Sequence, residues 1–215
     1  MIKLIIFDLD GTLVNAYPAV SQSVNDTLKQ LGFPRRTHAD IKRSVGWGDR
    51  HLMAHFVGED LADKAMRLYR PHHAWTLASP GSVKFLAGTK TLLPFLRREG
   101  YRLAIASNRP TRFTRIILKV LGIRHYFDMV LCADRAQRPK PYPDMLFDIL
   151  KRLKVPKSQA LYVGDMTIDV TTGQRAGIKT IAVTTGSSTR AELKRLKPAY
   201  LIAKINQVKI ILNRG

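Results

Sequence analysis

The sequence has a single cysteine, Cys132, few acidic residues and no long apolar run. One cysteine cannot form an intrachain disulfide, and it excludes zinc or iron–sulfur sites that need several thiolates. It fits a reducing compartment, so we expect a cytoplasmic protein. No apolar run approaches the ~20 residues of a membrane span, so no membrane is expected. The short apolar stretch at the N-terminus continues directly into acidic residues, which is not the layout of a signal peptide.

Acidic residues are scarce, since 16 Asp and Glu stand against 36 Lys and Arg, for a net charge of +20. Residues 1–80 hold 10 basic and 8 acidic residues, whereas residues 81–215 hold 26 and 8. The electrostatic field of so positive a chain attracts anions, either phosphorylated ligands or nucleic acid. The basic residues form no long run and match no known nucleic-acid module. We therefore interpret them as a solvated basic exterior and expect no nucleic-acid partner.

What is present is the composition of a globular protein, with 215 residues, 45% hydrophobic and 24% charged. The length fits one domain, or one domain with an insertion. Short apolar runs predict strands near Ile2–Phe7, Arg102–Ala106, Met129–Cys132, Ala160–Val163, Thr180–Val183 and Tyr200–Ile202. Helix-period segments lie between them, near Thr89–Arg98, Thr111–Leu121, Pro143–Leu153 and Ile168–Ala176. This alternation predicts an α/β fold with a doubly wound parallel sheet.

One stretch interrupts the alternation. From Tyr17 to His73 we find no convincing strand, only helical patterns at Val20–Leu31, His51–Val57 and Leu61–Tyr69. The sequence Pro80-Gly81-Ser82 predicts a linker back to the sheet. We therefore expect an α/β core domain of residues 1–14 and 83–215, with a helical domain of residues 15–82 inserted after the first strand. Open α/β sheets bind ligands at the carboxyl ends of their strands, where this insertion would lie.

The first candidate site is Asp8 and Asp10, which follow the first strand with one residue between them. Two carboxylates this close repel each other unless a cation or a proton intervenes. A turn aspartate beside a second solvated one is the structural alternative.

A second acidic pair, Asp165 and Asp169, follows the strand that ends near Val163. Asp165 could instead cap the helix that follows. In a parallel sheet, however, Asp8, Asp10 and this second pair emerge at the same edge. Several carboxylates that converge there form an oxygen-rich site for a hard cation, so we expect Mg²⁺.

Polar residues follow two further strands at that edge. Ser107 and Asn108 come after Leu103–Ala106, and Lys140 lies in a loop stiffened by prolines. Alone, Lys140 would be an ordinary surface lysine and Ser107 a turn or helix cap. Around a Mg²⁺ site, a hydroxyl, a backbone amide and an ammonium provide the charge neutralisation that a phosphoryl group needs.

In order along the chain, these residues form four motifs: Phe7-Asp8-Leu9-Asp10-Gly11-Thr12-Leu13-Val14, Ser107-Asn108, Lys140-Pro141 and Gly164-Asp165-x-x-x-Asp169. The set resembles the motifs of the haloacid dehalogenase superfamily over nearly the whole chain. The helical insertion resembles the C1-type cap of phosphoglycolate phosphatase-like members.

The resemblance implies a role for each motif residue. Asp8 would be the nucleophile that forms an aspartyl-phosphate, and Asp10 the general acid and base. Mg²⁺ would be held by Asp8, the backbone carbonyl of Asp10 and Asp165, with Asp169 in support. The catalytic Ser107 and Lys140 would bind the phosphoryl group, and the further substrate-binding positions are Asn108, Gly11 and Thr12. Chemistry agrees, because a carboxylate nucleophile splits phosphoester hydrolysis into two displacements.

Six positions bear on substrate choice. Asn15 stands where many capped members have an acidic residue, and Met166 where a small hydroxyl residue is common. Candidates within the insertion for the mouth of the substrate site are Arg43, Gly46, Trp47 and Arg50, although Trp47 is as well explained by packing between helices.

The sequence thus predicts a Mg²⁺-dependent phosphatase for a small phosphorylated metabolite, with phosphoglycolate as the first candidate and a monomer or homodimer as the assembly. Asp10 argues against a dehalogenase, which in this family lacks the second aspartate. A phosphomutase, a pyrophosphatase and a nucleotidase of the same family remain alternatives. A nucleic-acid-binding protein on the same scaffold is the alternative from another class.

Overall fold

A six-stranded, wholly parallel sheet forms the centre of the computed structural model, which describes residues 1–213. The strand order is β5-β4-β1-β6-β7-β8. The strands are β1 (Leu4–Phe7), β4 (Arg102–Ser107), β5 (Met129–Cys132), β6 (Ala160–Gly164), β7 (Lys179–Val183) and β8 (Tyr200–Ile202). A separate antiparallel pair joins β2 (Val14–Asn15) to β3 (Lys84–Phe85). The sheet confirms the predicted doubly wound α/β fold.

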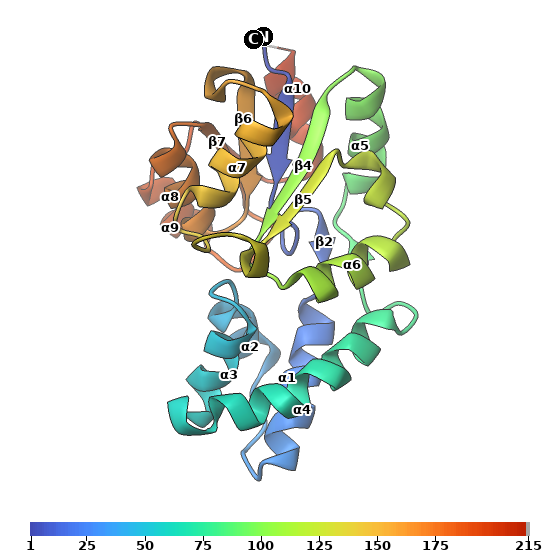
Figure 1. Ribbon diagram of the computed structural model, residues 1–215, viewed down its shortest axis with the longest axis vertical. Coiled ribbons are helices and arrows are strands. Elements are labelled where there is room, and N and C mark those ends of the chain that lie inside the picture. The colour runs from blue at the N-terminus through green and yellow to red at the C-terminus, as the bar shows by residue number, and fades with distance from the viewer. Residues whose placement is uncertain (214–215) are drawn as a thin grey trace.

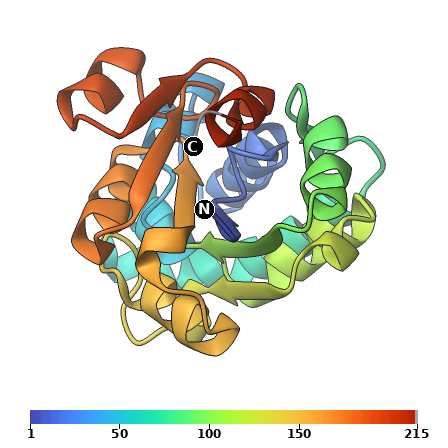
Figure 2. The ribbon, with the colours of Figure 1, turned by 90° about the horizontal axis from the view of Figure 1, so that it is seen from above.

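Helices cover both faces of the sheet, as Figure 2 shows from above. Those that follow β3 are α5 (Thr89–Arg98), α6 (Thr111–Val120), α7 (Asp144–Leu153), α8 (Thr167–Ala176), α9 (Arg190–Arg195) and α10 (Val208–Leu212). Short 3-10 turns lie at Arg124–Tyr126, Ala133–Arg135, Lys157–Gln159 and Ile205–Gln207. Among residues 1–213, no helix is long and apolar enough to cross a membrane.

Both faces of β1 are buried, because successive side chains of a strand point to opposite faces. Leu4 and Ile6 pack in a cluster with apolar residues of α7, while Ile5 and Phe7 pack in another with residues of α5 and α6. This is why the central strands read as continuous apolar runs rather than alternating ones.

Four helices gather at one end of the molecule, beyond the carboxyl ends of the strands (Figure 1). They are α1 (Tyr17–Gln30), α2 (His38–Ser44), α3 (Asp49–Val57) and α4 (Glu59–Ala78). The chain leaves for this helical layer through β2 and returns through β3, so the two connections lie side by side. The division into domains of residues 1–14 with 83–215 and of residues 15–82 stays a prediction.

The helical layer differs from the predicted pattern in two places. The pattern stops at Tyr69, before Pro71, whereas α4 continues to Ala78. The missing amide of Pro71 costs one helical hydrogen bond, but the extra turns bury His73 and Leu77. Helix α2 was not predicted, because Ile41 is its one buried residue and gives no apolar period.

Candidate active site

The candidate site lies where the sheet reverses its winding, with β1 between β4 and β6. At such a switch point the loops after neighbouring strands diverge and leave a crevice. Asp8 follows β1, Ser107 ends β4, and Asp165 follows β6. A pocket with an empty volume of about 570 Å³ opens here, lined by Asp8 from the core and by residues of the helical layer such as Gly46.

Lys140 lies at the centre of the site and is almost fully buried. Its Nζ donates to Oδ1 of Asp8 at 2.6 Å, to Oδ1 of Asp169 at 2.7 Å and to the hydroxyl of Tyr162 at 3.2 Å. Tyr162 in turn donates to Asp169 at 2.7 Å. All three protons of the ammonium are therefore used, which fixes Lys140 against the proposed nucleophile.

Electrostatics in this cluster are dominated by burial. Burial, with the nearby charges of Asp169 and Asp10, raises the pKa of Asp8 to about 7, although Lys140 opposes the shift. Burial and the charges of Asp8 and Asp169 also raise the pKa of Asp165 well above its usual value. Burial would lower the pKa of Lys140, but Asp169 and Asp8 hold it well above its usual value. One ammonium thus stands against three crowded carboxylates.

These carboxylates fit a divalent cation. Asp8, Asp165 and Asp169 each offer an oxygen atom, and these atoms lie within 4.8 Å of one another. Carboxylate oxygens are the ligands that Mg²⁺ prefers, and two negative charges in excess of Lys140 match its charge. The side chain of Asp10 is not part of this group, and a role for its backbone carbonyl at the metal stays a prediction.

Asp165 is held by hydrogen bonds rather than by a helix end. It accepts from the hydroxyls of Thr12 at 2.9 Å and Tyr17 at 3.3 Å, and from the amide of Ser187 at 3.1 Å. The N-cap of α8 is Met166, whose amide donates to Asp169, so the alternative interpretation of Asp165 as a cap is wrong. The neighbouring chain must approach closely, since a Cβ on Gly186 would lie 1.5 Å from Oδ2 of Asp165.

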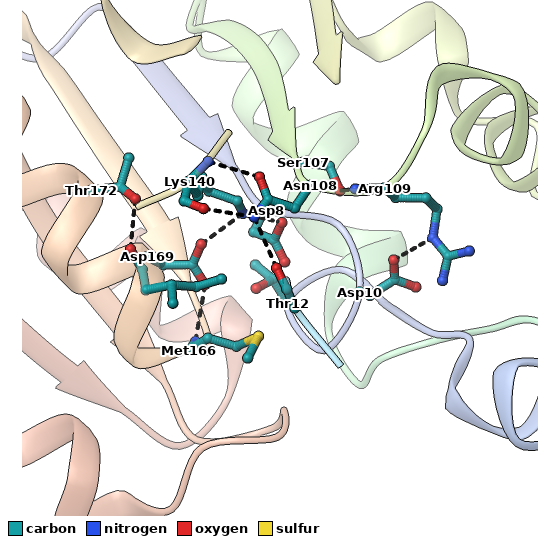
Figure 3. Close-up of polar contacts among 12 residues, drawn as sticks. Asp8, Asp10, Thr12, Ser107, Asn108, Arg109, Lys140, Met166, Asp169 and Thr172 are labelled. Carbon is teal, nitrogen blue, oxygen red and sulfur yellow. Dashed lines mark hydrogen bonds and ion pairs between the residues drawn. The ribbon is translucent and has the colours of Figure 1, made fainter. Parts of the chain in front are cut away.

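Asp10 points away from the acidic group and toward Arg109 (Figure 3). Nε of Arg109 donates to Oδ2 of Asp10 at 2.6 Å, and both side chains are largely buried. The Nη1 group of Arg109 donates to Nε2 of His73 at 2.8 Å. Arg109 therefore joins the proposed acid and base of the core to helix α4 of the helical layer.

His73 continues this chain of hydrogen bonds as a neutral imidazole. Burial, followed by the charges of Arg109 and His72, lowers the pKa of His73 to about 2. Because Nε2 accepts from Arg109, the proton resides on Nδ1, which contacts the hydroxyl of Ser23 at 3.0 Å. Ser23 donates onward to the carbonyl of Ala19 at 2.9 Å.

Asn108 makes a second connection between the layers. Its Nδ2 donates to the carbonyl of Gly46 at 2.9 Å and to that of Lys140 at 3.0 Å, while its Oδ1 accepts from the amide of Lys140 at 2.9 Å. Asn108 thus fixes the backbone that carries the lysine. Ser107 lies in the same pocket, and its Oγ accepts from the amide of Arg109 at 3.2 Å.

Four other positions singled out by sequence lie at different distances from the chemistry. Thr12 is buried against Asp165, and the carbonyl of Gly11 accepts from Thr185 at 2.6 Å. Arg43 forms an ion pair with Glu192 at 2.7 Å, and the side chain of Trp47 is half exposed. Neither Arg43 nor Trp47 is among the residues that line the pocket.

Sequence reasoning missed several residues of the site. Arg109 carried a signal, because it directly follows Ser107-Asn108 at the sheet edge. No pattern in the sequence marks Asp49, Tyr17 or His73 as site residues, since they reach the site only through the packing of the helical layer on the core.

Comparison with known proteins agrees with this geometry. Residues 5–183 match the family model described as haloacid dehalogenase-like hydrolase. The chain belongs to the haloacid dehalogenase-like hydrolase family. The chain is therefore an enzyme of the hydrolase class.

Relatives of this haloacid dehalogenase-like hydrolase include phosphatases. A phosphoglycolate phosphatase of Pseudomonas savastanoi pv. phaseolicola is 30% identical over 96% of this chain and 78% of its own length. The probable phosphatase IndB of Dickeya dadantii is also 30% identical, over 97% of this chain and 92% of its own length. A crystal structure of a predicted phosphoglycolate phosphatase from Haemophilus somnus superposes with a TM-score of 0.91, at 26% identity over 98% of both chains. The family and these relatives identify the chain as a phosphatase.

Proposed function

We propose that this phosphatase is Mg²⁺-dependent and hydrolyses the phosphoester of a small metabolite through an aspartyl-phosphate on Asp8. The observation that carries the proposal is the convergence of Asp8, Asp165 and Asp169 around Lys140 at the base of one pocket. Three buried carboxylates with one ammonium form a site for a cation and for a phosphoryl anion together.

The chemistry falls into two displacements. An oxygen of Asp8 attacks phosphorus, the bond from phosphorus to the leaving oxygen breaks, and Asp10 gives that oxygen its proton. Asp10 then takes a proton from water as the water oxygen attacks phosphorus, which releases inorganic phosphate and restores Asp8. Oδ1 of Asp10 has no hydrogen-bond partner among residues 1–213, so it is the oxygen available to hold this proton.

Both Lys140 and Ser107 line the pocket beside Asp8. Lys140 supplies a positive charge beside the phosphoryl group, and the Ser107 hydroxyl, which only accepts from the amide of Arg109, supplies a donor for a phosphoryl oxygen. The carboxylates of Asp8, Asp165 and Asp169 would hold Mg²⁺, together with the backbone carbonyl of Asp10. When bound, the ion would neutralise negative charge on the phosphoryl group.

The helical layer of residues 15–82 would act as a cap over the core. Its Gly46 and Asp49 line the same pocket as Asp8, so the substrate would lie between the layers. The named substrate of the relatives makes phosphoglycolate the first compound to test, in a cytoplasmic setting.

The proposal is tested with purified protein, Mg²⁺ and a generic aryl phosphate. We expect turnover that a metal chelator abolishes and that Asp8→Asn reduces by at least ~10⁴-fold, because the covalent route is lost. Asp148→Asn, on the surface of α7, is the matched control and should retain full activity. Turnover that survives Asp8→Asn would refute the mechanism.

Phosphate release across sugar phosphates, pyrophosphate and nucleotides separates the hydrolases of this family from one another. A phosphomutase would instead convert its substrate with little phosphate released.

A further inference from the structure

Three buried polar atoms lack hydrogen-bond partners among residues 1–213, and they belong to one neighbourhood. They are Oδ1 of Asp10, Oδ2 of Asp49 and the hydroxyl of Tyr69. Asp10 is hydrogen-bonded to Arg109, Asp49 lines the pocket beside both, and the ring of Tyr69 stacks on His73, which accepts from Arg109. Buried polar atoms are almost always paired, so three unpaired ones around a single side chain indicate a place built for a polar ligand.

This place belongs to the leaving-group side of the pocket. Asp10, Asp49 and Arg109 all line the pocket that contains Asp8. If the phosphoryl group lies between Asp8 and Lys140, the leaving oxygen must meet Asp10, its proton donor. The remainder of the leaving group then lies beside Asp49, which lines the pocket, whereas Tyr69 does not.

The charges here disfavour an anionic leaving group. Arg109 already donates to Asp10 through Nε and to His73 through one proton of Nη1, so its charge is shared with Asp10 before any ligand binds. His73 is neutral. Asp49, the first residue of α3, forms no ion pair within 4 Å among the described residues, so its charge is not matched by a direct partner.

The chemistry of the orphaned atoms defines what they can bind. An ionised Asp49 can only accept hydrogen bonds through Oδ2, whereas Oδ1 of Asp10 holds the proton for the leaving oxygen. A hydroxyl or an ammonium group of the ligand would therefore satisfy Oδ2 of Asp49. A carboxylate would leave Oδ2 of Asp49 unpaired and bring two negative charges together.

We propose that Asp49 is a specificity-determining residue that binds a hydrogen-bond donor on the leaving group and rejects a carboxylate there. The inference rests on the proposed phosphatase function and deepens it. The inference predicts that this chain disfavours phosphoglycolate, the substrate for which several relatives are named, because the leaving group of phosphoglycolate carries a carboxylate.

The test compares three small substrates: glycerol 3-phosphate with hydroxyls, phosphoethanolamine with an ammonium, and phosphoglycolate with a carboxylate. We expect the kcat/KM of the wild type to be at least about tenfold higher for one of the first two than for phosphoglycolate. Asp49→Asn should lower that preference by about tenfold. Asp60→Asn, an exposed carboxylate on α4, is the matched control and should leave it unchanged.

Two variants distinguish the donors. Asp49→Asn keeps an oxygen that accepts from a hydroxyl but loses the charge that pairs with an ammonium. Asp49→Leu removes both the accepting oxygen and the charge, so it should lower kcat/KM for either substrate. If Asp49→Asn impairs only phosphoethanolamine, the ligand is an ammonium; if glycerol 3-phosphate withstands Asn but not Leu, it is a hydroxyl.

A wild type that prefers phosphoglycolate would overturn the inference, and so would a preference unchanged in both Asp49 variants. Aryl phosphate is measured beside each substrate. Normal turnover of aryl phosphate with no dependence on Asp49 overturns this inference alone. No turnover of any phosphate ester overturns the proposed function and this inference with it.

Discussion

Nη1 of Arg109 donates a hydrogen bond to Nε2 of His73 across 2.8 Å, and this bond joins the core to the helical layer. The same guanidinium donates through Nε to Asp10 at 2.6 Å. One side chain therefore sets the position of the proposed acid and base and also fastens helix α4 over it. The planar fork of arginine is what makes both contacts possible at once.

We expect Arg109→Lys to lose both stability and activity. A single ammonium cannot reproduce two donors in a fixed fork, so either Asp10 or His73 would be left without a partner. Loss of one partner from a buried ion pair costs about 3 kcal/mol or more. Urea unfolding should show that loss, and kcat/KM with aryl phosphate should fall at least about tenfold. Arg112→Lys, exposed on α6, is the control; an equal effect there would contradict the argument.

Because His73 is buried as a neutral imidazole, we expect the free energy of unfolding to fall as the medium becomes acidic. Its pKa is about 2 in the fold, because of burial and then the charge of Arg109, against ~6.5 in the unfolded chain. The unfolded chain therefore binds a proton below pH 6.5 that the fold excludes. The stabilisation is complete above pH 6.5 and is lost as the pH falls from there toward 2.

His73→Gln should remove this dependence, since its amide oxygen can still accept from Arg109 but does not titrate. Between pH 6.5 and 5.5 the wild type should lose about 1 kcal/mol more than the variant. Urea unfolding at the two pH values measures the difference. The exposed His51→Gln is the control and should behave as the wild type does; parallel losses in all three proteins would refute the prediction.

The fold was accessible from sequence because its central strands are buried on both faces. That burial makes Leu4–Phe7 and Arg102–Ser107 apolar throughout, and the strand pattern follows directly. Parallel topology then brings the residues after each strand to one edge. The sequence alone therefore predicts that Asp8, Lys140 and Asp165 lie near one another.

The other side of the pocket could not be predicted in this way. Asp49 and His73 reach the site because α3 and α4 pack against the core, and their own spacing carries no sign of it. A buried histidine within an amphipathic helix pattern gives the same signal as any core residue. The orientation of Asp10 toward Arg109 likewise depends on the packed structure.

At Gly46 the backbone of the helical layer lies close to the side chain of Met166 in the core. Its φ is +110°, and a Cβ there would lie 2.4 Å from Cε of Met166. We expect Gly46→Ala to lower kcat/KM about tenfold, because the flexible end of Met166, which lines the pocket, would have to turn away from the new Cβ and disturb the substrate site. The backbone strain alone should cost about 1 kcal/mol of stability.

Gly58→Ala is the matched control for Gly46→Ala. It has a φ of +85°, but a Cβ there would meet no atom within 4 Å. It should lose similar stability in urea and keep its activity. Equal loss of activity in both variants would show that strain, rather than the contact with Met166, is responsible.

Mg²⁺ should stabilise the wild type, because the crowded carboxylates of Asp8, Asp165 and Asp169 are balanced only by Lys140. An ion that binds only the folded state adds about 2.7 kcal/mol at 100 times its Kd. Asp165→Asn removes one ligand and one of the repelling charges. Both oxygens of Asp165 accept hydrogen bonds, so the amide nitrogen of Asn would face a buried donor. We therefore expect that variant to lose some stability without Mg²⁺ and to gain far less than the wild type when Mg²⁺ is added. Thermal unfolding with MgCl2, against NaCl of equal ionic strength, measures both quantities. Asp148→Asn should gain as much as the wild type; an equal gain in Asp165→Asn would exclude Asp165 as a ligand.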